Sequence, residues 1–243
     1  HLHCGREIND NGIFPGGAPG LLHRCTDIKG KIQLCAGKAL RGILQTNLGI
    51  TVSHIPLYHL GAYDKARLDN LLDACEAKDY VFTVASGRAL LALEELFDGF
   101  VDRIAIIAEN GALVQYKGEV LFESKLDPKD YLEIADTTLA LPTCEGILLS
   151  GRRGAYAPND ADPAYLKAME RYYENVMATD LEAVTDDIFK VTAKFQGDTI
   201  MERGDYLNTI FEDMTAVTTG FDSMDIILKG VDKGFGLYHL CQE

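Results

Sequence analysis

The sequence lacks the features that mark several common protein classes. No stretch approaches about 18 consecutive apolar residues, so no membrane span is expected, and the start, HLHCGREIND, lacks the apolar segment of a signal peptide. The six cysteines form no Cys-x-x-Cys pair, which favours free thiols in a reducing compartment. The net charge of −14 argues against nucleic acid, which attracts clustered basic residues. We therefore expect a cytoplasmic protein with no membrane and no nucleic-acid partner.

A further absence divides the chain. No aspartate or glutamate occurs between Asp27 and Asp64, and residues 1–63 hold six of the 23 Lys and Arg but only three of the 37 Asp and Glu. Five of the six histidines also lie before residue 64. This shift in composition predicts a boundary near residue 63. Residues 1–63 show no clear hydrophobic period and stay unassigned. The segment HLHC offers three possible zinc ligands without an evident fourth, so no metal site is predicted there.

From residue 64 onward the pattern is easier to interpret. A helix is expected over 64–80, with Asp64 as its N-cap, followed by a short buried strand over 80–85. A second helix is expected to begin just after Gly87, and a second apolar strand covers 104–108. Strands that alternate with helices predict a parallel sheet covered on both faces, and hence an α/β core.

After residue 108 the predicted elements no longer alternate strictly between strand and helix. Two short strands around Lys117-Gly118 predict a hairpin over 110–124. Helices are expected over 127–141, 162–176 and 204–214, and strands over 146–151 and 187–195, the latter half-exposed. We therefore predict an inserted α+β unit over 113–219, an antiparallel sheet with helices on one face. It interrupts a core formed by 64–112 and 220–243.

The turn Ser86-Gly87-Arg88 joins the first predicted strand to the next helix. Ligands of parallel α/β sheets bind at the carboxyl ends of the strands, where helix N–H groups attract anions. Ser86 supplies a hydroxyl donor, Gly87 lets a ligand approach the backbone, and Arg88 can bind a phosphate or carboxylate through two N–H groups. The alternative is a serine that merely caps the helix, with a solvated arginine.

Two further segments could contribute to the same site. Asn110 and Gly111 end the second strand, although Asn-Gly is also a common turn sequence. Lys233 begins the last predicted helix, where the helix dipole disfavours a cation unless an anion is bound. Lys229 is the competing candidate, and a plain surface lysine is the alternative. We expect the Ser86 and Lys233 side chains to lie about 4 to 8 Å apart, because both follow strands of one parallel sheet.

The ordered set TVASGR, IAIIAENGALV, a long α+β insert and MDIILKGVDKGFGLYHL resembles the Cof-type (subclass IIB) branch of the haloacid dehalogenase (HAD) superfamily. The resemblance implies a HAD-like Rossmannoid core with an inserted cap, and a magnesium-dependent phosphatase of small phosphorylated metabolites such as sugar phosphates. It places Ser86 on the hydroxyl that contacts the transferring phosphoryl group and Lys233 on the lysine that steadies its charge. Gly87, Arg88, Asn110 and Gly111 then line the substrate-binding mouth.

The sequence also departs from the family pattern. The Asp-x-Asp nucleophile motif would fall in GITVSHIPLYHLGAY (residues 49–63), which contains no acid, and the family's metal-binding loop would follow the last helix, after which the sequence given ends. A misjoined start and a true extra N-terminal segment both account for residues 1–63. Three readings therefore stay open: a phosphatase of the family, a non-catalytic protein that binds phosphorylated metabolites, and a defective gene product.

Overall fold

The computed structural model describes residues 32–36, 44–45, 51–53, 63–220 and 222–242. The chain divides into two compact units, one of residues 1–83 with 241–243 and one of residues 84–240. Most of the unassigned segment 1–63 lies outside the described residues, and so does the HLHC segment. No helix of the described part is both long and apolar enough to cross a membrane.

The described residues of the first unit form short strands and the helix α2. Its strand order is β2-β3-β1-β4, and β1 pairs in parallel with β3. The helix α2 begins where the sequence predicts, because the Asp64 carboxylate accepts a hydrogen bond from the Arg67 N–H at 3.1 Å. Leu68, Leu72 and Cys75 form its buried face. The bounds are β1 Ile32–Ala36, β2 Leu44–Gln45, β3 Thr51–Ser53, α2 Lys65–Glu76 and β4 Val81–Ala85, which crosses into the second unit.

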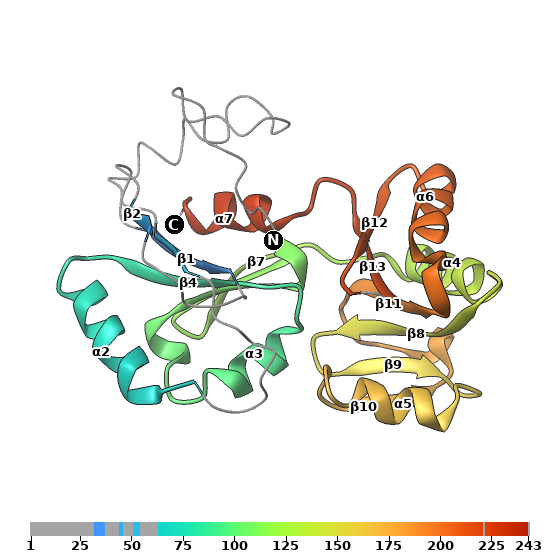
Figure 1. The fold of residues 1–243 in the computed structure, drawn as a ribbon, viewed down its shortest axis with the longest axis horizontal. Coiled ribbons are helices and arrows are strands. Elements are labelled where there is room, and N and C mark those ends of the chain that lie inside the picture. Colours follow the sequence, from blue (N-terminus) through green and yellow to red (C-terminus); the bar gives the residue numbers. More distant parts are fainter. Residues whose placement is uncertain (1–31, 37–43, 46–50, 54–62, 221, 243) are drawn as a thin grey trace. The chain divides into compact units, whose positions relative to one another are not determined.

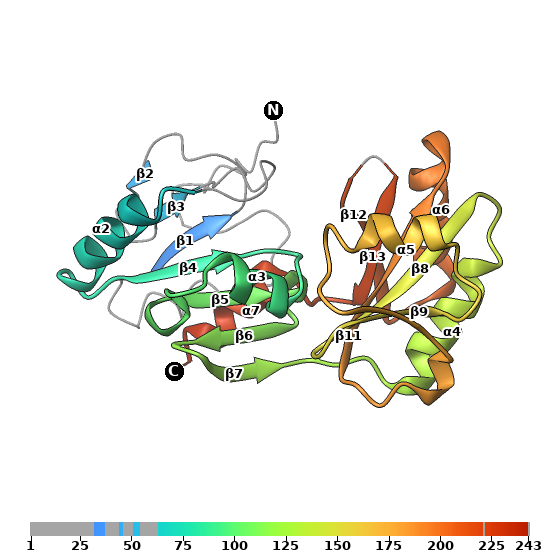
Figure 2. The same cartoon turned by 90° about the horizontal axis from the view of Figure 1, so that it is seen from below.

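The second unit begins with the sheet order β4-β5-β6-β7. The hairpin at Lys117-Gly118 is confirmed, since both residues have positive φ and β6 pairs with β7. Its strands also pair with β5, so the hairpin belongs to this sheet (Figure 2). The predicted start of the insert at residue 113 therefore differs from the structure, where the insert follows Glu123. The elements are α3 Leu90–Leu96, β5 Ala105–Ala108, β6 Leu113–Tyr116 and β7 Glu119–Glu123.

The insert forms a second sheet with the order β10-β9-β8-β11-β13-β12 (Figure 1). Its pairs are antiparallel except β9 with β10. The strand β13 was expected to return to the core sheet, but it pairs with β11 and β12, so the insert ends near Leu228. The bounds are α4 Pro128–Leu139, β8 Cys144–Gly151, β9 Ala155–Pro158, α5 Pro163–Met169, β10 Val176–Thr179, β11 Ile188–Phe195, α6 Ile200–Ile210, β12 Met214–Thr218, β13 Ser223–Leu228 and α7 Lys233–Leu240.

Both faces of the second sheet are covered. Helices α4 and α6 pack on the face that carries Val191 and Ala193 of β11. Helix α5 packs on the other face, where Tyr165 and Met169 share a buried apolar cluster with Ala89, the residue that follows the Ser86 turn. Helices were expected on one face only, with strand 187–195 half-exposed. Instead, β11 is buried along nearly its whole length. On its second face Lys190 contacts Gly87 and Glu109, and Thr192 forms a hydrogen bond with Tyr173.

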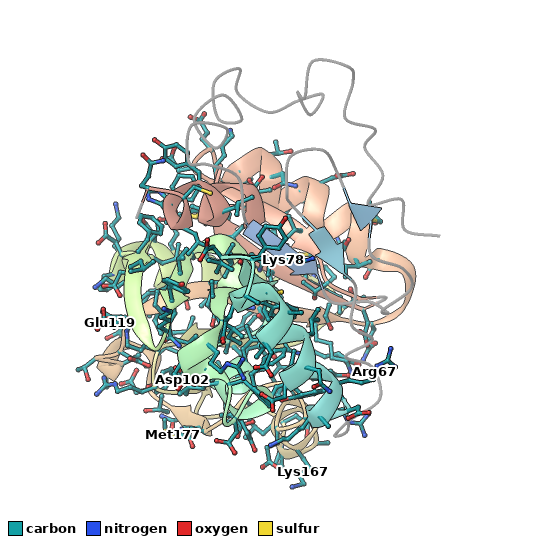
Figure 3. The ribbon with its side chains drawn as sticks, turned by 90° about the vertical axis from the view of Figure 1, so that its left-hand side faces the viewer. Arg67, Lys78, Asp102, Glu119, Lys167 and Met177 are labelled. Atoms are coloured by element: carbon teal, nitrogen blue, oxygen red, sulfur yellow. The ribbon has the colours of Figure 1, made fainter. Side chains whose placement is uncertain are left out.

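Charged side chains of the helices and loops outside these sheets lie mostly at the surface. Arg67, Asp102 and Lys167 are exposed examples (Figure 3). Cys75 and Cys241 are buried and Cys144 is half-buried.

Asp186 anchors the loop that leads into β11. Its side chain is only 3% exposed and accepts hydrogen bonds from Arg153 N at 2.8 Å, Arg153 Nε at 3.0 Å and the Tyr156 hydroxyl at 2.9 Å. Burial alone would raise the pKa of the Asp186 carboxyl, but these donors outweigh burial and lower its pKa. The ionised form of Asp186 therefore stabilises the fold.

We predict that Asp186→Asn lowers the free energy of unfolding by about 1 to 3 kcal/mol at neutral pH, because the amide cannot accept all the donors. A lowered pKa contributes stability above the unfolded value of about 3.9, and this contribution is lost as the pH falls through the folded value. Urea unfolding should therefore show the difference from the parent shrinking in strong acid. Asp160→Asn, at an exposed turn, is the control, and a pH-independent difference would contradict the prediction.

Candidate functional site

The Ser86 turn is held by backbone hydrogen bonds immediately after β4. Ser86 N donates to Ile107 O at 2.9 Å, and the Ser86 hydroxyl oxygen accepts from Arg88 N at 3.1 Å. Helix α3 begins only at Leu90 and has no side-chain cap, so the predicted helix start after Gly87 is wrong by two residues. Ser86 is therefore not a helix cap. Its hydroxyl bridges the turn, and because Oγ acts there as an acceptor, its own proton is left to donate.

A second turn, Glu109–Gly111, lies against the first. Asn110 N donates to Ser86 O at 3.1 Å, and Glu109 N donates to Arg88 O at 3.0 Å. Glu109, Asn110 and Gly111 all have positive φ, at 49°, 59° and 115°. Left-handed backbone is costly for residues other than glycine, so this turn is strained.

The two turns bring five of the six predicted site residues together. A Cβ on Gly87 would lie 2.5 Å from Asn110 Oδ1, which shows how closely the two turns approach. Ser86, Gly87, Arg88 and Asn110 are half-buried, and Gly111 is buried. Among the described residues, no carboxylate forms an ion pair with the Arg88 guanidinium, which leaves it available to an anion.

Lys233, the sixth, begins α7, and its neighbour caps that helix. Asp232 Oδ1 accepts from Phe235 N at 2.8 Å, so a carboxylate already complements the helix N-terminus. The helix dipole alone therefore does not require a bound anion beside Lys233. A Cβ on Gly111 would lie 3.1 Å from Lys233 N, which places the start of α7 next to the second turn.

The prediction that Lys233 and Ser86 follow strands of the same parallel sheet is wrong. Lys233 does not follow a strand of the first sheet, because β13 belongs to the second sheet. The Lys233 side chain is exposed. The separation of about 4 to 8 Å between the two side chains stays a prediction.

A buried ionic cluster lies beneath both turns. Lys190 Nζ contacts Asp225 Oδ2 at 3.1 Å and Glu109 Oε2 at 3.3 Å, and it also donates to the Gly87 carbonyl. We call Lys190, Glu109 and Asp225 the Lys190 cluster; each is at most 2% exposed. Asn110 Nδ2 donates to Asp225 Oδ2 at 2.8 Å. Two hydroxyls complete the cluster, Thr192 Oγ1 donating to Asp225 Oδ1 at 2.8 Å and Ser150 Oγ donating to Glu109 Oε1 at 2.9 Å.

The electrostatics of the cluster follow from one cation facing two carboxyls. Burial disfavours the charged form of Lys190, but Asp225, with Tyr173 and Glu109, outweighs burial and raises the pKa of Lys190 well above its usual range. Burial also raises the pKa of Glu109, and the opposing effects of Lys190 and Ser150 do not cancel this rise. Lys190 is therefore charged, with Asp225 as its nearer carboxylate and Glu109 as the carboxyl that protonates more readily than usual.

The residues of the Lys190 cluster were not among the site residues predicted from the sequence. Lys190 and Thr192 alternate with Val191 and Ala193, a pattern typical of a strand with one solvent-exposed face. The usable signal was Asp225, an acid inside the apolar run MDIIL, because buried acids require a partner.

We predict that Gly111→Ala destabilises the protein by about 3 kcal/mol or more, because the new Cβ would lie 1.9 Å from the backbone oxygen of Asp232. Gly118→Ala is the matched control, since Gly118 also has positive φ but no atom lies within 4 Å of its added Cβ. Urea unfolding of both variants separates the clash from the backbone strain. Equal losses of unfolding free energy in the two variants would contradict the prediction, because they would mean that α7 shifts to accept the new Cβ without an energetic cost.

Comparison with known proteins places this geometry in a family. A curated relative, the 5-amino-6-(5-phospho-D-ribitylamino)uracil phosphatase YbjI of Escherichia coli, is 29% identical over 180 residues. The alignment covers 73% of this chain and 66% of the relative, so the chain spans just under two thirds of that protein's length.

Solved structures share the fold. SMU.1108c from Streptococcus mutans superposes with a TM-score of 0.71 at 21% identity, covering 88% of this chain and 76% of that one. The HAD subclass IIB sugar phosphatase BT4131 superposes with a TM-score of 0.63 at 14% identity, covering 87% and 75%. The model of the haloacid dehalogenase-like hydrolases matches residues 64–243, the region that carries both turns, the insert and Lys233. This confirms the resemblance seen in the motifs: the chain belongs to the haloacid dehalogenase-like hydrolase family.

Proposed function

We propose that the protein is by family a Cof-type phosphatase of small phosphorylated metabolites, such as sugar phosphates, that the chain as written is inactive, and that the Ser86 and Asn110 turns form its phosphate-binding region. The proposal depends on the juxtaposition of these two turns with Arg88, which no carboxylate of the described residues pairs with. Family membership supports it, and so does the name of the Escherichia coli relative, a phosphatase of a phosphorylated ribityl compound.

Each residue has a physical role in this proposal. The Ser86 hydroxyl donates to a phosphate oxygen, and Arg88 offers two N–H groups to the same phosphate. Gly87 has no side chain, so the phosphate can approach the backbone of the first turn. The Asn110 side chain bounds the phosphate-binding region on the side of the second turn. Lys233 adds a positive charge from the start of α7. These groups hold the phosphate and offset its charge, which is most of what phosphoryl transfer requires of a protein.

Magnesium enters the proposal through the family, and the described residues do not fit a magnesium site. Magnesium prefers an octahedron of oxygen ligands that includes carboxylates. No three His, Cys, Asp or Glu side chains of the described part lie together in a way that could hold a metal ion. The two buried carboxyls nearest the turns, Glu109 and Asp225, are occupied by Lys190.

A second candidate function rests on the missing nucleophile. The family mechanism forms an aspartyl-phosphate, and residues 28–63 contain no carboxylate to form it. Most of this segment lies outside the described residues. The alternative is a non-catalytic protein that binds phosphorylated metabolites in the same two turns.

We predict that the purified chain binds inorganic phosphate, measured by isothermal titration calorimetry. Ser86→Ala and Arg88→Ala should each weaken binding about tenfold, the effect of losing one hydrogen bond to a charged group. Lys229→Ala is the control, because Lys229 Nζ donates to the Glu212 carbonyl at 3.0 Å. No phosphate binding, or an equal loss in the control, would rule out this site.

We predict that the chain as written does not hydrolyse p-nitrophenyl phosphate, with or without magnesium, because the remaining groups position a phosphate but cannot form the covalent intermediate. Phosphate binding without turnover is therefore the expected result. Metal-dependent turnover that Lys233→Ala abolishes would show instead that the protein has a nucleophile outside residues 49–63.

A further inference from the structure

The contact between Lys190 and the Gly87 carbonyl joins the insert to the Ser86 turn. The Gly87–Arg88 peptide is bonded at both ends, since its carbonyl accepts from Lys190 and its N–H donates to the Ser86 hydroxyl oxygen at 3.1 Å. The described residues contain no cis peptide bond, and a trans peptide directs its C=O and N–H in opposite directions. Lys190 and Ser86 therefore lie at opposite ends of one peptide group.

This arrangement fixes the hydroxyl of Ser86. The N–H of Arg88 occupies a lone pair of Ser86 Oγ, so the hydroxyl proton is left for another acceptor. A positive charge at the carbonyl end polarises the peptide and strengthens the hydrogen bond that its N–H donates. The effect is large because Lys190 is only 1% exposed, where water screens charge poorly.

The charge of Lys190 is itself secured by its neighbours. Asp225 and Glu109 lie within 3.3 Å of its ammonium nitrogen, and Asp225 also holds the Asn110 amide at 2.8 Å. One buried cation thus contacts the backbone of the first turn directly and the side chain of the second turn through Asp225.

We propose that Lys190 is a positioning residue of the phosphate site, which acts through the Gly87–Arg88 peptide to present the Ser86 hydroxyl as a donor. This inference rests on the proposed phosphate-binding function. Lys190 does not touch the phosphate itself. Its contribution should therefore vanish when the Ser86 hydroxyl is removed.

The test compares phosphate affinities in a double-mutant cycle. Lys190→Met, which keeps an unbranched side chain one atom shorter and removes the charge, should weaken inorganic phosphate binding about tenfold in the parent and less than about twofold in the Ser86→Ala background. Lys194→Met is the matched control, because Lys194 lies on the same strand and pairs with Glu145 at 2.6 Å. It should change affinity less than about twofold. Equal losses from Lys190→Met in both backgrounds, or no loss in the parent, would overturn the inference.

A second variant protects the test against misfolding. If Lys190→Met does not unfold cooperatively, Lys190→Met/Asp225→Asn also removes the carboxylate nearer to Lys190 and is compared with Asp225→Asn alone. The same fold-changes are expected in that pair, and the same results would overturn the inference.

A spectroscopic readout separates this inference from the proposed function. In protein labelled with ¹⁵N-arginine, the Arg88 amide proton should shift upfield in Lys190→Met and stay in place in Lys194→Met, with no phosphate added. An unmoved Arg88 resonance would overturn the inference about Lys190. A shifted resonance in a protein that binds no phosphate would support the Lys190 contact and overturn the proposed function.

Discussion

The ammonium group of Lys190 contacts Asp225, Glu109 and the Gly87 carbonyl in a place that water does not reach. Withdrawing such a charge from water costs several kcal/mol, and only good geometry with further hydrogen bonds offsets that cost. Thr192, Ser150 and Asn110 supply those bonds. Breaking a pair of this kind typically costs about 3 to 5 kcal/mol, a large fraction of the 5 to 15 kcal/mol that stabilises a domain. The stability of this unit and the geometry of its site therefore depend on the same atoms.

The strained second turn depends on this cluster most directly. Glu109 and Asn110 both adopt left-handed backbone, at a cost of about 1 to 2 kcal/mol each. Each side chain has a buried partner, Lys190 for Glu109 and Asp225 for Asn110. The strain persists because these partners would lose their own bonds if the turn relaxed. The turn thus stays in the conformation in which Asn110 meets Ser86.

Local chemistry made part of the site predictable from the sequence. The Ser86 turn and the Asn110 turn follow apolar strands directly, so short motifs were sufficient to find them. The strands that pair with β13 and with the 113–123 hairpin were not predictable in this way. The sequence of an apolar strand does not indicate which of two sheets it belongs to. Lys190 was missed for a related reason. Its alternation with Val191 predicts a solvent-exposed face, and only the contacts of Lys190 with Gly87 and Glu109 show that this face is buried.

The limits of the insert have a consequence for exchanging modules between relatives. The insert runs from Ser124 to Leu228, so it carries Lys190 and Asp225, whereas Gly87, Glu109 and Asn110 belong to the recipient. A transplanted insert without a lysine at this position would leave the recipient's Glu109 buried with no cation, and the Gly87 carbonyl without its donor. The insert of a chimaera should therefore be chosen first for buried charged groups that pair with those of the recipient. Similar surface loops are a secondary criterion.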